Sequence, residues 1–167
     1  INKDYNGNKL IHLIIVQNND KLFKEYITKK YNLNLTDVNG NTPHHLLLGQ
    51  YLNIDKFKLI INKKICWNNK NNNGDSIIRI ILTNNNIFNK LKEYHSYFMT
   101  KEILNGNYYN YNLICQNLSE KNILNYSDLI NFDYNHDENP PLFSLLNNNN
   151  IEDKIKNHKY SPDAVIG

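Results

Sequence analysis

The chain has 167 residues, a formal net charge of +3 and a sequence pI of ≈ 8.7, with a mean hydropathy of −0.65. So small and dispersed a positive charge disfavours nucleic acid as a partner. No apolar run reaches the ~18 residues of a transmembrane helix, so we expect no membrane partner. Cys66 and Cys115 form neither a CxxC pair nor a disulfide framework. We therefore expect two buried thiols and an intracellular, reducing compartment, cytoplasmic or nuclear.

Asparagine supplies most of the polarity, with 35 residues. Together with abundant Ile, Lys and Tyr, this composition is typical of AT-rich coding genomes, such as those of some large DNA viruses and protists. This concerns codon usage and not function, and it leaves open a viral or protist host-interaction protein.

A polar turn followed by two short apolar helices opens the chain. Asp4-Tyr5-Asn6-Gly7-Asn8 is rich in turn-forming residues. Apolar residues then recur with helical spacing and predict an inner helix over residues 9–18 and an outer helix over residues 21–30. We call this arrangement of turn, inner helix and outer helix a unit.

The second unit repeats this plan 33 residues later, with clearer signals. Gly40 suits a positive φ in the turn. Thr42 is placed to cap an inner helix over residues 42–50, and Pro43 occupies its first position. Asn53 is placed to cap the outer helix that follows.

Later units keep less of the pattern. The third predicts an inner helix over residues 76–84 and an outer helix from about residue 86. The pattern then loosens, and further helices are predicted over residues 108–117, 119–130, 142–146 and 151–157. We therefore predict five units beginning near residues 4, 37, 71, 103 and 135, in a single domain spanning residues 1–167 that is degenerate over residues 95–130.

The start of the second unit carries a family resemblance. Asp37, Gly40, Thr42, Pro43 and His45 stand in the order Asp-x-x-Gly-x-Thr-Pro-x-His. This segment resembles the ankyrin repeat, with His44 where Leu is usual and Leu47 where Ala is usual. The resemblance implies an all-α solenoid of stacked helix-turn-helix units with β-turn tips, each unit covering its neighbour. It also implies that His12 and His45 bond the turns and link units, and are not catalytic.

Motifs for chemistry are weak throughout the chain. His44 and His45 are adjacent and would point apart on a helix, unlike the i, i+4 pair of a zinc helix. No Cys/His spacing matches a zinc site, and the recurrent glycines belong to turns. We expect His95, His136 and His158 in solvated loops or helix ends. The sequence thus predicts a protein that is not an enzyme, with no cofactor, no metal and no small-molecule substrate.

The ankyrin resemblance implies a protein–protein interaction scaffold whose partner docks on the concave face made by turn tips and inner helices. Asn and Gln side chains donate and accept hydrogen bonds, which suits a peptide backbone or polar side chains. Asn filling solvated turns with no binding role is an equal alternative. The predicted partner-binding residues are turn positions and inner-helix ends, namely Tyr5, Asn6, Asn8, Gln17, Val38, Asn39, Asn41, Gln50, Asn72, Asn73 and Asp75.

Two other functions stay open. The chain begins at Ile1 inside a unit and without a capping unit, so we expect a fragment of a longer protein, such as the targeting arm of a larger enzyme or ubiquitin-ligase adaptor. The weaker alternative, nucleic-acid binding, would use lysines that we expect on the solvent face of an outer helix and the segment after it, namely Lys56, Lys58, Lys63, Lys64 and Lys70.

The last residues, 160–167, bear a slight similarity to the Ser-Pro-Asp segment of viral recombinase nucleases. They lack the downstream Glu-x-Lys of those enzymes, which favours a further turn or a linker.

Overall fold

The computed structural model describes residues 9–29, 31–105 and 109–129, together with Asn148. Within these ranges helices alternate with turns, no strand forms, and an isolated antiparallel bridge joins Lys70 and Ser76. The predicted all-α fold class is therefore confirmed for the described part of the chain.

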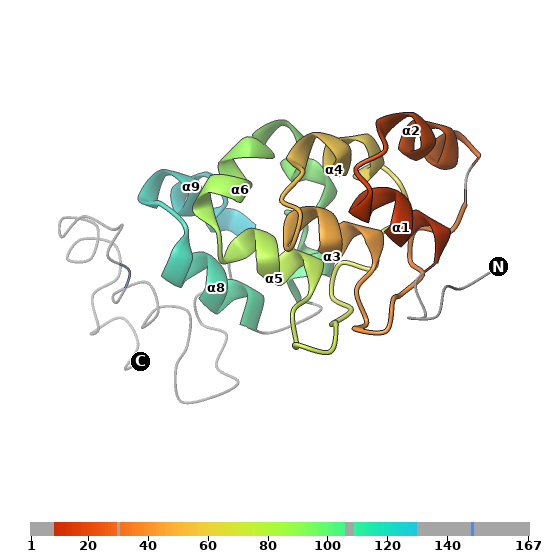
Figure 1. Cartoon of the computed structure of the whole chain (residues 1–167). Coiled ribbons are helices and arrows are strands. Elements are labelled where there is room, and N and C mark those ends of the chain that lie inside the picture. The colour runs from red at the N-terminus through yellow and green to blue at the C-terminus, as the bar shows by residue number, and fades with distance from the viewer. Residues whose placement is uncertain (1–8, 30, 106–108, 130–147, 149–167) are drawn as a thin grey trace, which may run out of the picture.

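The helices lie in two rows (Figure 1). Their bounds in the inner row are α1 (Leu10–Val16), α3 (Pro43–Leu48), α5 (Ile77–Leu82) and α8 (Tyr109–Asn117). In the outer row they are α2 (Asp20–Thr28), α4 (Ile54–Ile60), α6 (Asn85–Lys90) and α9 (Glu120–Asn125). α1 packs on α2, α3 on α4 and α5 on α6, while α1, α3, α5 and α8 stack in that order. Each helix pair thus lies against its neighbours along the chain.

Side-chain caps decide where the short helices begin. Thr42 accepts a hydrogen bond from the His45 N–H, and Pro43 occupies the first helical position. Asn53 caps α4 by accepting from the Lys56 N–H at 3.0 Å. These caps were predicted, and α3 ends two residues before the predicted end at Gln50. Such caps each contribute about 1 kcal/mol, which matters for helices this short.

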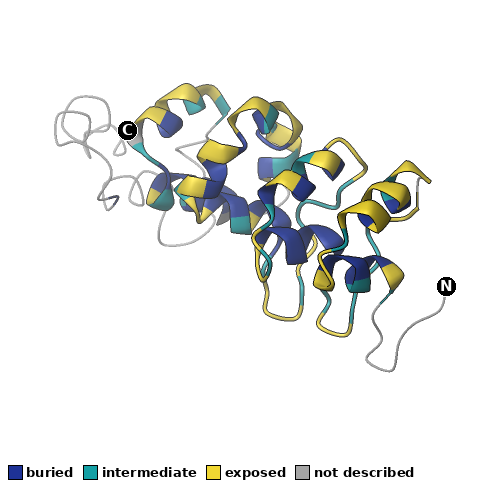
Figure 2. Ribbon diagram, turned by 45° about the horizontal axis from the view of Figure 1, so that its top comes forward, coloured by how far each residue is buried: buried dark blue, intermediate teal, exposed yellow. Residues whose placement is uncertain are grey.

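The core runs between the rows and between the helix pairs. Phe23, Phe57 and Phe88, one from each of the outer helices α2, α4 and α6, have no exposed surface. Figure 2 shows the inner helices α3 and α5 buried over most of their surface and the turns before them exposed. Burial of one such aromatic side chain contributes about 1.5–3 kcal/mol.

The region after α6 falls largely in the stretch that the sequence predicted to be degenerate, residues 95–130. The chain forms a 3-10 helix there, η1 (Lys92–Tyr97), and a short helix, α7 (Lys101–Asn105). Phe98 and Leu104 are fully buried there, so apolar anchoring and not turn chemistry fixes this segment.

His95 corrects a prediction, because it is buried in η1 and not solvated. Its ring lies 4.0 Å from the Phe88 ring, centroid to centroid, and its Nε2–H donates to the Phe88 carbonyl at 2.8 Å. The hydroxyl of Tyr126 donates to the other ring nitrogen. Contacts from residues far along the chain therefore enclose this histidine.

The fourth helix pair is shorter than predicted. The outer helix expected over residues 119–130 is α9 followed by a 3-10 turn, η2 (Ser127–Leu129), and Ser119 makes no capping hydrogen bond with its side chain. The predicted turns near residues 4 and 106, the fifth unit, His136, His158 and the tail lie outside the described residues.

Candidate functional site

Two turns project side by side from the starts of α3 and α5 (Figure 1). We call residues 37–42 the first tip and residues 71–76 the second tip. The side-chain oxygen of the leading residue, Asp37 or Asn71, accepts hydrogen bonds from the backbone N–H groups two and four residues later, at 2.8 to 3.0 Å. The two tips therefore share one internal hydrogen-bonding pattern, although an amide replaces the carboxylate in the second.

The tips are joined directly to each other. The backbone N–H of Asn72 donates to the carbonyl of Asn39 at 2.9 Å, and its side-chain amide donates to the carbonyl of Val38 at 3.0 Å. The amide of Asn71 donates to the side-chain oxygen of Asn41 at 2.8 Å. These bonds hold the second tip in register against the first.

The glycines of the two tips have different surroundings. Gly40 has φ +73°, and a Cβ there would lie 2.7 Å from the side-chain oxygen of Asn72. Gly74 has φ +82°, but no heavy atom of the described residues would lie within 4 Å of its Cβ. The second tip therefore packs over Gly40, whereas none of the described residues packs over Gly74.

His12 and His45 link each unit to the next tip. Nδ1 of His12 accepts from the Lys9 N–H at 3.1 Å, and Nδ1 of His45 accepts from the Thr42 N–H at 3.2 Å. Because a carbonyl can only accept, Nε2 carries the proton and donates at 3.1 Å to the carbonyl of Asn41 or of Asp75, respectively. The bonding role that the resemblance implied for these histidines is what the structure shows.

Burial lowers the pKa of both linking histidines. The carbonyl contacts and the nearby Asp37 or Asp75 oppose this shift without reversing it. Both rings are therefore neutral near pH 7 with both nitrogens engaged, so neither is available as a general base.

Both side-chain nitrogens of His44, in α3, are buried and have no hydrogen-bond partner. The pKa of His44 is lowered to about 3, mainly by burial and in addition by the neighbouring His45. The Ile60 carbonyl opposes this shift without forming a good hydrogen bond. The ring packs edge-on to Phe57 at 6.0 Å. His44 thus acts as an apolar core residue in the position where Leu was expected.

The predicted partner-binding residues divide into three groups. The side chains of Asn41, Asn72 and Asp75 form bonds within or between the tips or, for Asp75, with Arg79. Exposed side chains with no bond of this kind belong to Gln17, Val38, Asn39, Gln50 and Asn73. Tyr5, Asn6 and Asn8 lie outside the described residues.

An apolar stripe on α1 was not among the predicted residues. Leu10 is 53% exposed, Leu13 is half-buried and Val16 is 48% exposed. These positions are three residues apart and share one face with Gln17, as helical periodicity requires. The same periodicity was present in the sequence, where the apolar residues of this segment served only to predict the helix.

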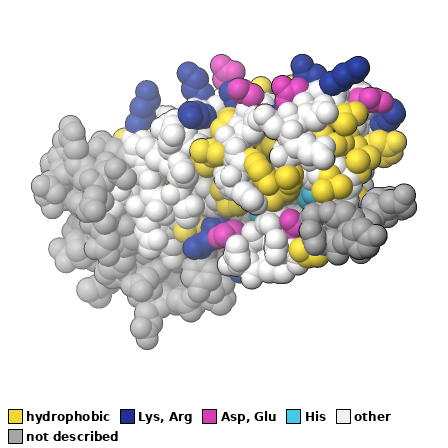
Figure 3. All heavy atoms as spheres, viewed as in Figure 1, with side chains coloured by type: hydrophobic (Ala, Val, Ile, Leu, Met, Phe, Trp, Pro, Cys, Tyr) yellow, Lys and Arg dark blue, Asp and Glu magenta, His cyan; other side chains and the backbone are white. Residues whose placement is uncertain are grey.

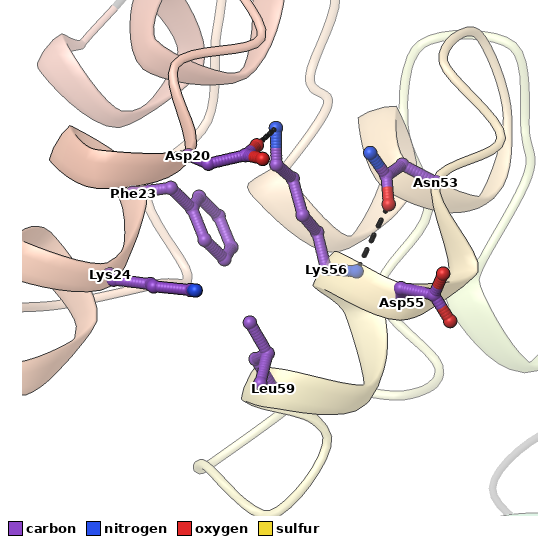
Figure 4. Close-up of a pocket in the computed structure, with 7 residues that line it drawn as sticks. All are labelled: Asp20, Phe23, Lys24, Asn53, Asp55, Lys56 and Leu59. Atoms are coloured by element: carbon purple, nitrogen blue, oxygen red, sulfur yellow. Dashed lines mark hydrogen bonds and ion pairs between the residues drawn. The ribbon is translucent and has the colours of Figure 1, made fainter.

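Pockets among the described residues are open grooves between units. One, of ≈ 380 Å³, lies between α2 and α4 (Figure 4). Lys56 was expected in solvent, but its side chain is 7% exposed and its ammonium lies 2.7 Å from the carboxylate of Asp20. That ammonium lowers the pKa of Asp20 through a hydrogen bond and through charge. The pocket also contains Lys24 and Asp55, so its charges balance.

The two cysteines lie in different surroundings. Cys115 is fully buried, and burial raises its thiol pKa to about 12. The prediction of a buried thiol is wrong for Cys66, which is only half-buried. Its backbone N–H donates to the side-chain oxygen of Asn34. No group of three or more His, Cys, Asp or Glu side chains in the described ranges is arranged to hold a metal.

Charge is distributed unevenly over the face seen in Figure 3. Lysines and acidic side chains gather along the outer helices, whereas the tips contain no lysine or arginine and carry the carboxylates of Asp37 and Asp75. None of the helices described combines the length and the apolar composition needed to cross a membrane.

Comparisons with protein-family models, with curated proteins and with solved structures found no match.

Proposed function

We propose that this chain is an ankyrin-type scaffold, without catalytic activity, that binds a partner protein through its two tips and the exposed face of α1. The observation that carries the proposal is the direct hydrogen bonding between the tips, in which Asn72 bonds the backbone of both Val38 and Asn39. A surface fixed in this way loses little conformational entropy when a partner binds.

The chemistry of this surface suits a peptide segment or loop of a protein. Val38, in the first tip, is 58% exposed, and Leu10 and Val16 add exposed apolar area on α1. Asn39 and Asn73 carry exposed amides that can bond a peptide backbone. The tips contain no lysine or arginine and carry the carboxylates of Asp37 and Asp75. This argues against nucleic acid, whose binding depends on neutralised phosphates.

An affinity pull-down with a matched control tests the proposal. The tip variant carries Val38→Ala, Asn39→Ala and Asn73→Ala, which remove exposed side chains with no bond between the tips. The control carries Lys21→Ala, Lys58→Ala and Lys90→Ala on the outer row, and circular dichroism checks the fold of both.

We expect a protein that wild type and control retain and that the tip variant loses. Equal retention by all three would place binding on another surface and overturn the proposal, as would a complete lack of retained protein. Retention that is lost only in the outer-row control would point to charge-driven binding instead.

A further inference from the structure

A second groove lies between the segments that follow α2 and α4. We call it the return groove, formed by residues 31–34 and 62–64 with Ile27 of α2, and its volume is ≈ 470 Å³. It shares no lining residue with the tips, and it is open along one side. The volume falls within the range of about 300–1,000 Å³ that ligand pockets occupy.

Apolar groups form part of this groove. Leu33 is buried and Ile27 is half-buried, whereas Tyr31 is 51% exposed. The Tyr31 ring packs on Tyr26 at 4.6 Å between centroids. An aromatic ring held in this way offers an exposed face to an apolar side chain of a ligand.

The charge of the groove has one sign. Lys63 and Lys64 line it and are both exposed, and none of the described residues that line it is acidic. On the adjoining helix, Glu25 is already paired with Lys29 at 2.9 Å. The groove therefore differs from the pocket in Figure 4, where Asp20 and Asp55 balance the lysines.

The two walls are fixed to each other before any ligand binds. The Asn34 side chain donates to the Lys64 carbonyl at 2.8 Å and accepts from the Cys66 N–H at 3.3 Å. The side chain of Asn32 accepts from the Asn34 N–H at 2.8 Å. This preorganisation lowers the cost of ordering the groove around a ligand.

We propose that the return groove binds an acidic peptide segment of a partner protein, with an apolar or aromatic side chain beside Tyr31 and flanking carboxylates beside Lys63 and Lys64. Two lysines and an apolar floor suit one short segment of this kind. A nucleic acid would require a longer track of cations, and along the outer row cations alternate with acidic side chains (Figure 3). The site is separate from the tips, so its occupation does not depend on the function proposed for them.

Fluorescence anisotropy with the 167-residue chain tests this site. The probes are fluorescein-labelled octapeptides with Leu, Phe, Tyr or Trp at the centre and Asp or Glu at the other positions. Matched peptides carry Asn or Gln in place of the acids, or Gly at the centre, and oligothymidylate of equal net charge serves as the polyanion. The protein variants are Lys63→Gln with Lys64→Gln, and Tyr31→Ala. The charge-matched control is Lys58→Gln with Lys90→Gln, which lies beside another pocket.

We expect at least one acidic peptide to bind and to bind about tenfold more weakly to each return-groove variant. Affinity for the control variant should stay within about twofold, because its lysines lie outside the groove. Amide resonances of residues 31–34 and 62–64 should shift on titration, while those of the tips stay in place.

Four results would overturn the proposal. The first is that no acidic peptide binds. The second is that the neutral or centre-Gly peptides bind as tightly as the acidic ones. The third is that the control variant loses as much affinity as the return-groove variants. The fourth is that oligothymidylate binds as tightly as the peptides, which would make the groove a polyanion site.

Discussion

Two successive joints of this array are built differently. At the joint between α3 and α5, His45 donates to the carbonyl of Asp75, and the first and second tips stack. At the joint between α5 and α8, the position equivalent to His45 is Arg79, which is exposed and pairs with Asp75 of its own unit at 3.3 Å. After α6 the chain then forms η1 and α7, and no third tip is described.

Asparagines replace the histidine link at the second joint. The amide of Asn110 donates to the side-chain oxygen of Asn68 at 3.2 Å, and that of Asn122 donates to Asn85 at 2.9 Å and Asn89 at 3.0 Å. A histidine at a fixed position in each unit specifies one geometry, whereas an amide can bridge from many positions. Among the described residues, the two tips that stack belong to the joint at which a histidine, His45, bonds the next tip.

The largest expected effect is on the histidine link itself. His45→Ala removes the bonds to Thr42 and Asp75. The buried Thr42 N–H then loses its acceptor, while the Asp75 carbonyl keeps only the bond from the Asn71 N–H at 2.9 Å. We expect the free energy of unfolding to fall by about 2–4 kcal/mol. Urea denaturation followed by circular dichroism measures it, and a loss below about 1 kcal/mol would contradict the importance given to this link.

The next effect separates the two tip glycines. Gly40→Ala forces a side chain onto a positive φ and against Asn72, so we expect a loss of about 2–3 kcal/mol. Gly74→Ala meets only the backbone strain, because none of the described residues lies close to the added Cβ, and should cost about 1 kcal/mol. The same denaturation experiment compares them, and equal losses would show that a tip also packs over Gly74.

A third effect depends on pH and concerns His44, in the core beside the joint between α3 and α5. The pKa of His44 is about 3 in the folded chain, whereas that of a fully solvated histidine is 6.5, so between these values the unfolded chain binds a proton that the folded chain does not. Stability therefore falls as the pH falls from 6.5 toward 3. His44→Leu removes this loss and should gain about 2 kcal/mol more relative to wild type at pH 5 than at pH 7.5.

Denaturation curves of wild type and His44→Leu at the two pH values provide the measurement. The comparison with wild type cancels the contributions of His12, His45 and His95, whose pKa values burial also lowers. A gain that is the same at both pH values would mean that His44 does not stay neutral in the folded chain.

Much of the regular part of the fold was readable in the sequence. Thr42 and Asn53 cap helices as predicted, and Ser76 caps a helix where one was predicted to begin. These positions could be predicted because capping is a local interaction between residues three apart. Gly40 was assigned to a turn for its positive φ, which it has. Local chemistry of this kind is repeated in each regular unit, so the period reinforces it.

The joint between α5 and α8 could not be predicted from the sequence, because contacts between residues far apart in the chain define it. Asn68 donates to the carbonyl of Ile103, 35 residues on, and Tyr126 encloses His95 from 31 residues away. No local motif announces such contacts, and 35 asparagines offer many equivalent bridging amides. For the same reason, exposed tip residues and bridging ones such as Asn41 could not be separated before the structure.

The smallest expected effect is at Arg79, the counterpart of His45. Its ion pair with Asp75 is solvent-exposed on both sides, with 46% and 41% of the side chains accessible. Arg79→Ala should therefore change the free energy of unfolding by less than about 0.5 kcal/mol, because exposed pairs are screened and entropically costly. Urea denaturation beside His45→Ala gives the comparison directly. A loss comparable with that of His45→Ala would mean that Arg79 links its unit to the next one, and the two joints would then differ in geometry but not in the position that stabilises them.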